Sequence, residues 1–101
     1  NSLRRASVLF EIVRLYDAMG MLDLCVEHVG VCIAALDPDR SAEEKQLKAT
    51  VHRFAANVFV REARAVCDGK GSFFFDDRIA EFLVQAIQHY ELVLQLYSVH
   101  E

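Results

Sequence analysis

The stretch DRIAEFLVQAIQHYELVLQLYS, from Asp77 to Ser98, decides the fold class. Its apolar residues recur at intervals of three and four over about five turns. They are Ile79, Phe82, Leu83, Ala86, Ile87, Tyr90, Val93, Leu94 and Tyr97. Polar residues take the opposite face, which is typical of a helix that packs on one side. Since Asp76 or Asp77 can cap the first turn, we predict a helix over residues 77–98.

Three further helices are predicted upstream of this one. Their expected bounds are residues 3–19, 21–36 and 42–68. The first ends at Gly20, in the position where a left-handed cap residue is favoured. The second is apolar on nearly all sides, which indicates a central helix. A strand over residues 29–33 is the alternative, although this segment lacks the alternation of a half-buried strand.

The third helix is expected to begin at a capping box. The Ser41 hydroxyl can accept a hydrogen bond from the amide of Glu44, whose carboxylate can reach back. No glycine or proline interrupts residues 42–68, so one long helix is expected, in which Asn57 could mark a bend. Short loops make neighbouring helices antiparallel. The expected fold is therefore all-α, with about four helices in antiparallel hairpins that form a bundle or a short α-solenoid.

Composition narrows the range of functions. The 101 residues fit one domain, 53% of them are hydrophobic, and 11 basic and 15 acidic residues give a net charge of −4. Charges of both signs are interspersed, whereas nucleic acid requires a clustered basic face. No apolar run is long enough to span a bilayer. We therefore expect a protein partner or self-association through surplus apolar surface, with no nucleic acid and no membrane insertion.

The cysteines and the first residue indicate the cellular location of the chain and its relation to a longer protein. Three cysteines on predicted helix interiors fit reduced, buried thiols better than disulfides. A cytoplasmic or nuclear location is therefore expected. Because the chain starts with Asn rather than Met, we expect residues 1–101 to be a single helical domain from a longer protein.

Residues Leu9 to Pro38 resemble a tetratricopeptide repeat, a helix–turn–helix unit of about 34 residues. The positions that carry the pattern hold Leu9, Ile12, Val13, Tyr16, Gly20, Leu22, Cys25, Val29, Cys32 and Pro38. Val13 replaces the usual small residue, Pro38 falls one position late, and no second copy follows. A looser similarity is to the irregular helical repeats of α-solenoid scaffold proteins such as nucleoporins and coat-complex subunits. The resemblance implies a stacked helical hairpin whose role is binding.

One helix face carries candidate metal ligands. Cys25, His28 and Cys32 are spaced at i, i+3 and i+7, and His52 on the next predicted helix could supply a fourth ligand. Free cysteine in a helix interior more often acts as a small hydrophobe, so core packing is the preferred interpretation. No cofactor is therefore expected. A metal-binding or redox-sensing helical domain that uses Cys25, His28 and Cys32 is the alternative function.

The sequence holds no pattern typical of a catalytic site. Its serines lie at predicted helix ends, where capping explains them. The acidic pairs Glu43/Glu44 and Asp76/Asp77 lie at predicted helix N-termini, where the helix dipole favours negative charge. We therefore expect no enzyme activity and assign no catalytic residue.

Two further segments are candidate sites. The segment Arg4-Arg5-Ala6-Ser7-Val8 resembles the acceptor consensus of cyclic-AMP-dependent kinase, which makes Ser7 a phosphorylation candidate. The interaction candidates are aromatic or large apolar residues, namely Phe73, Phe74, Phe75, Leu92 and Leu96. The three phenylalanines can equally fold back and plug the open end of a bundle.

The sequence thus predicts a non-enzymatic protein–protein interaction or scaffold module that binds through apolar helical surface, with self-association as one form of that binding. A pocket for a small molecule between helices is a further alternative. Its lining residues would be Phe54, Phe82 and Tyr90.

Overall fold

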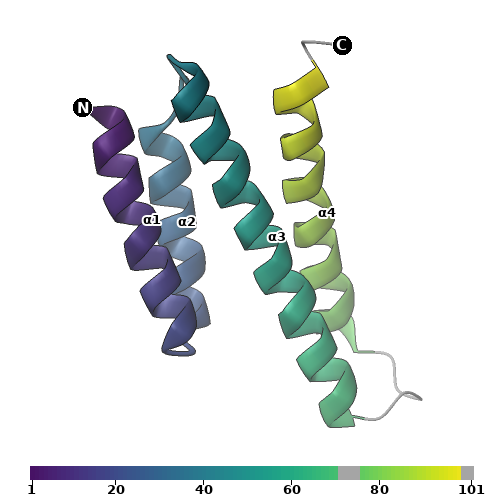
Figure 1. Cartoon of the computed structure of the whole chain (residues 1–101). Coiled ribbons are helices and arrows are strands. Elements are labelled where there is room, and N and C mark those ends of the chain that lie inside the picture. The colour runs from purple at the N-terminus through teal and green to yellow at the C-terminus, as the bar shows by residue number, and fades with distance from the viewer. Residues whose placement is uncertain (71–75, 99–101) are drawn as a thin grey trace. The chain divides into compact units, whose positions relative to one another are not determined.

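A computed structural model describes residues 1–70 and 76–98 of the chain, and the fold is all-α (Figure 1). The helices are α1 (Ser2–Ala18), α2 (Leu22–Ala35), α3 (Ala42–Lys70) and α4 (Asp77–Ser98). The expected bounds agree with these to within two residues at every helix end. No strand occurs among the described residues, so the strand alternative for residues 29–33 is wrong.

Local hydrogen bonds explain where α1 begins and ends. The side chain of Asn1 accepts a hydrogen bond from the Arg4 amide at 3.1 Å, which caps the first turn. Gly20 has a φ of 73°, and its amide donates to the carbonyl of Asp17 while the Met21 amide donates to the carbonyl of Tyr16. This is a Schellman motif, in which glycine adopts the left-handed conformation without steric cost. The prediction that Gly20 ends the first helix is confirmed.

The start of α3 confirms the predicted capping box with one difference. The Glu44 amide donates to Ser41 Oγ at 3.1 Å, as expected. The Glu44 carboxylate accepts from the amide of Arg40 at 3.3 Å, one residue before the Ser41 amide of a standard box. From there α3 runs as one helix through Asn57 to Lys70.

The contacts between Cα atoms divide the chain into two compact units, and the boundary falls inside α3. The first unit is residues 1–52 and the second unit is residues 53–101. One domain over all 101 residues stays a prediction.

In the first unit, α1 and α2 pack side by side as an antiparallel hairpin (Figure 1). The buried residues of this hairpin are Ala6, Val13, Cys25, Val29, Cys32 and Leu36. The connection after α2 is tied to α3 by Lys48, whose Nζ lies 3.7 Å from Asp37 and 3.9 Å from Asp39. This hairpin buries one stripe of each helix, as amphipathic packing requires.

Although α2 is apolar on nearly all sides, it is not buried on all sides. Cys25, Val29 and Cys32 are buried, whereas Val26 and Val31 are exposed. The expectation of a fully central helix is therefore met on one face only. In the described part of the chain, no helix has both the length and the apolar character needed to cross a membrane.

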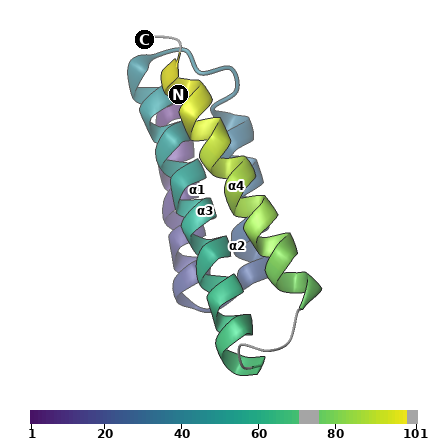
Figure 2. The same cartoon turned by 90° about the vertical axis from the view of Figure 1, so that its right-hand side faces the viewer.

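In the second unit, the C-terminal half of α3 and α4 pack as an antiparallel pair (Figure 2). Ala56 and Phe59 of α3 form a core cluster with Ala86 of α4. The ring of Phe59 lies 6.1 Å from the ring of Phe82 and is stacked on His89, with 5.9 Å between centroids. One row of α4 side chains, spaced at three and four residues, therefore forms the core contact with α3.

Candidate functional site

The two cysteines among the metal-ligand candidates are part of the core of the first unit. Cys25 and Cys32 are both buried. The Cys32 thiol donates to the carbonyl oxygen of Ala6 at 3.3 Å, and burial raises the pKa of this thiol to about 11. Because the thiolate is the form that binds metals, burial that favours the protonated thiol makes Cys32 a weaker ligand.

The two histidines lie on different helices, His28 on α2 and His52 on α3. His28 Nδ1 lies 2.8 Å from the carbonyl oxygen of Leu24, so this nitrogen carries the proton and donates. The His28 ring lies 4.9 Å from the ring of Tyr16 on α1. His52 is buried on α3. No group of three or more His, Cys, Asp or Glu side chains could hold a metal ion among the residues that the structure describes.

Ser7 lies in the second turn of α1. Its hydroxyl donates to the carbonyl oxygen of Leu3 at 2.8 Å. Arg4, Arg5 and Ser7 are exposed, whereas Ala6 between them is buried against α2. The kinase-like segment is thus helical, and phosphorylation of Ser7 stays a prediction.

The interaction candidates have mixed outcomes. Phe73, Phe74 and Phe75 lie outside the described residues. Leu92 is exposed on α4, and Leu96 is half-buried. The structure thus leaves Leu92 accessible to a partner and Leu96 only partly so.

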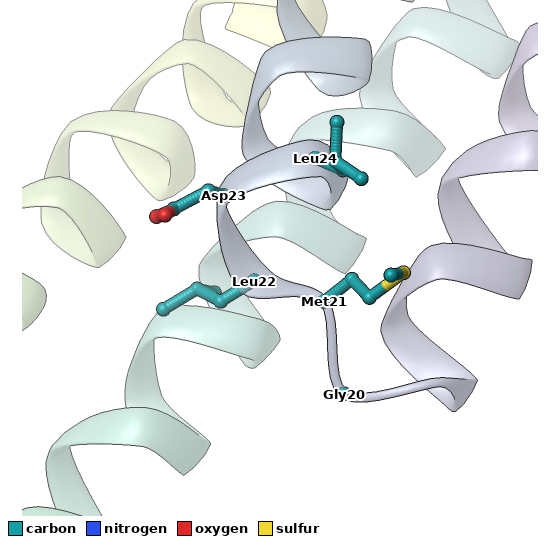
Figure 3. A pocket seen from close by; sticks show the side chains of 5 residues that line it. All are labelled: Gly20, Met21, Leu22, Asp23 and Leu24. Carbon is teal, nitrogen blue, oxygen red and sulfur yellow. The ribbon is translucent and has the colours of Figure 1, made fainter.

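Phe54, Phe82 and Tyr90 line neither of two surface hollows formed by described residues. The first, of about 440 Å³, lies at the turn between α1 and α2 (Figure 3). It is lined by Gly20, Met21, Leu22, Asp23 and Leu24, and the side chains of Met21 and Leu22 point to opposite sides of the turn. The second, of about 300 Å³, is lined by Gln88, Glu91, Leu92 and Gln95 of α4. Each is formed by one short segment, whereas ligand pockets generally enclose most of the ligand surface.

The α4 helix exposes a row of large apolar side chains beside the row that contacts α3. We call this the α4 row, and it consists of Leu83, Ile87, Tyr90, Leu94 and Tyr97. Their exposed fractions run from 38% for Tyr90 to 69% for Leu94. The spacing of four, three, four and three residues places all five along one side of the helix. The apolar face of α4 is therefore wider than the surface that α3 covers.

Arginines of α3 border the α4 row. The two helices meet at a hydrogen bond in which the Tyr90 hydroxyl donates to Asn57 Oδ1 at 2.5 Å. Arg53 and Arg61 lie one turn before and one turn after Asn57, and Arg64 lies one turn further along. All three arginines are exposed. We call the α4 row together with Arg53, Arg61 and Arg64 the α3–α4 flank.

A shorter apolar row lies on α1 in the first unit. It consists of Val8, Leu15 and Met19, all exposed. Their spacing of seven and four residues places them on one side of α1. Each unit thus exposes apolar side chains of its own.

Sequence reasoning did not identify the α3–α4 flank and chose Leu92 and Leu96 instead. A signal for it was present in the width of the apolar face of α4. One row of apolar positions follows the spacing 82, 86, 89, 93 and 96, with His89 as its polar member, and a second row follows one residue later. Because one neighbouring helix covers about one such row, a second row indicates a second contact.

We compared the chain with protein-family models, with curated proteins and with solved structures, and none matches.

Proposed function

We propose that this chain is a non-enzymatic protein-interaction or scaffold module that binds a partner through apolar helical surface. The observation that carries the proposal is the α4 row, five large apolar side chains that are each at least 38% exposed. Burying apolar surface is favourable by about 25 cal/mol per Å². Contiguous apolar patches of more than a few hundred Å² are uncommon on monomeric proteins, and they mark interaction sites.

The first hairpin supports a scaffold form of this proposal. Its sequence resembles a tetratricopeptide unit, and stacked hairpins of that kind bury their outer faces against further helices. The exposed α1 row of Val8, Leu15 and Met19 offers such a face. An α-solenoid scaffold protein, of the kind that includes nucleoporins and coat-complex subunits, is the class that we propose.

A reducing compartment fits the same proposal. The three cysteines form no disulfide in the described part of the chain; Cys25 and Cys32 are buried, and Cys67 is exposed. An exposed free thiol is more common in the cytoplasm or nucleus than in an oxidising compartment. We therefore propose one of these two locations for the module.

The experiment measures association of the full chain with and without the α4 row. Ile87→Glu combined with Leu94→Glu places two charges in the row. Gln85→Glu combined with Gln88→Glu adds the same charge to exposed positions on the other side of α4. Light scattering and capture from the native source are measured for the wild type and both double variants.

The proposal expects the wild type and the Gln85/Gln88 variant to associate, and the Ile87/Leu94 variant to lose that association. Circular dichroism checks that all three remain helical. A wild-type chain that stays monomeric at high concentration and captures nothing would overturn the proposal. Equal association by both double variants would overturn the role of the α4 row.

A further inference from the structure

We propose that the α3–α4 flank binds an amphipathic helix that carries acidic side chains along one edge of its apolar stripe. This inference rests on the proposed function and names the class of partner. It comes from the combination of two exposed features that lie side by side in the second unit: the α4 row and the arginines of α3.

The length and spacing of the α4 row favour a helix as the occupant. The row extends from Leu83 to Tyr97, which at 1.5 Å per residue is about 21 Å, or four turns. A partner helix that lies along α4 would present its own residues at i, i+3, i+4 and i+7, the spacing of helix-in-groove recognition. An extended peptide has no sheet edge to join here, because the backbone groups of α3 and α4 are bonded within the helices.

The hydrogen bond between Tyr90 and Asn57 sets how the arginines align with the row. Because α3 and α4 are antiparallel, positions before Asn57 on α3 lie level with positions after Tyr90 on α4. Arg53 is therefore level with Leu94, and Arg61 is level with Ile87, each about one turn from the hydrogen bond. A helix seated on the α4 row would thus have the arginines of α3 along one of its edges.

The charges around the flank favour an acidic edge on the partner. Arg61 is paired with its neighbour Glu62 at 3.3 Å, whereas Arg53 and Arg64 have no ion pair within the described residues. Glu91 lies at the other edge of the row, away from α3. Exposed ion pairs each contribute little affinity, but complementary charges select the partner and its orientation.

The same charges disfavour a second copy of the flank as the occupant. If two copies paired about a twofold axis through Asn57 and Tyr90, Arg53 of one copy would face Arg61 of the other. Like charges placed opposite each other oppose association. The two-copy arrangement therefore lacks the complementarity that an acidic helix provides.

The experiment uses the full chain and two synthetic peptides. Both peptides are helices of about five turns with the same leucine stripe, but one carries a row of Glu beside the stripe and the other a row of Lys. Fluorescence anisotropy measures the Kd of each at low and high salt. We expect the Glu peptide to bind about tenfold more tightly than the Lys peptide, with the difference reduced at high salt.

Three double variants assign the effect to the flank. Arg53→Glu combined with Arg64→Glu should weaken binding of the Glu peptide about tenfold and strengthen binding of the Lys peptide. Ile87→Ser combined with Leu94→Ser should abolish binding of both peptides. Arg4→Glu combined with Arg5→Glu changes the charge by the same amount on α1 and should leave the Kd unchanged. Circular dichroism confirms that each variant is helical.

Several outcomes would overturn the inference. They are equal Kd values for the two peptides, no binding of either peptide to the folded wild type, and an equal effect of the control variant. If the wild type self-associates and the Ile87→Ser/Leu94→Ser variant does not, the α4 row binds a second copy of the chain instead. If the Ile87/Leu94 variant loses binding to a natural partner but the Arg53/Arg64 variant keeps it, the inference of an acidic partner helix is overturned. The proposed function would still stand.

Discussion

Two glycines in the first hairpin should respond in opposite directions to the same substitution. Gly20 has a φ of 73° at the end of α1, whereas Gly30 lies inside α2 with ordinary helical geometry. Apart from its chain neighbours and the backbone of its own helix, a Cβ atom added at either position would meet no atom within 4 Å. Steric clash therefore contributes at neither site, and the backbone conformation alone decides whether alanine raises or lowers the stability.

The expected magnitudes follow from that difference. A left-handed conformation costs alanine about 1–2 kcal/mol. The smaller entropy of the unfolded alanine chain offsets about 0.4–1 kcal/mol of this cost, so Gly20→Ala should destabilise by about 1 kcal/mol. At Gly30, alanine is the better helix former, and Gly30→Ala should stabilise by about 0.8 kcal/mol. The two variants should therefore differ by about 10 °C in Tm.

Urea and thermal unfolding, followed by circular dichroism, measure both variants against the wild type. Gly20→Asn serves as a check, because asparagine tolerates the left-handed conformation better than alanine does and should recover part of the loss. A Gly20→Ala variant as stable as the wild type would refute the Schellman assignment. Destabilisation by Gly30→Ala would refute the position of this glycine on an exposed helical face.

Four further predictions concern the core and the ionisable groups. Phe59→Ala should destabilise the second unit by about 3 kcal/mol in urea unfolding, because it removes the ring that contacts Phe82 and His89. In native protein a thiol reagent should modify Cys67 quickly and leave Cys32 unmodified until denaturant is added; rapid modification of both would contradict the raised pKa of Cys32. Burial lowers the pKa of His89, so the unfolded chain binds a proton at this residue first as the pH falls below about 6.5. The free energy of unfolding should therefore drop between that pH and pH 5. Urea unfolding at each pH measures this dependence, which His89→Gln should flatten. A chelator should leave the Tm of the purified chain unchanged, whereas a loss of stability would revive the metal-binding alternative.

The helix ends could be predicted because they depend on interactions within a few residues. The left-handed Gly20 and the hydrogen bond from the Glu44 amide to Ser41 Oγ both follow from neighbours along the chain. The Glu44 carboxylate differs slightly from the prediction, because it accepts from the Arg40 amide, whose position depends on the conformation of the connection before α3. Short-range hydrogen bonds of this kind need no knowledge of the packing.

Residue type favoured core packing for Cys25 and Cys32, and both are buried as predicted, but spacing alone could not assign the contacts of these residues or of His28. The spacing correctly puts them on one helix, but contacts with α1 decide what Cys32 and His28 do. Cys32 bonds the Ala6 carbonyl, and His28 lies against Tyr16. Both contacts join residues far apart in the sequence, so the periodicity of α2 holds no information about them.

The amphipathic stretch from Asp77 to Ser98 also has some features that the sequence determines and others that depend on tertiary contacts. By itself the sequence determined that this stretch is helical and that it carries two adjacent apolar rows, because helical periodicity is a local property of the chain. The tertiary structure alone decided which row is covered: Phe82, Ala86 and His89 pack against α3, and Leu83, Ile87 and Leu94 stay exposed. Since the two rows are equally apolar over much of their length, only the position of α3, held by the contacts of Phe59 and the hydrogen bond of Asn57, distinguishes core from surface.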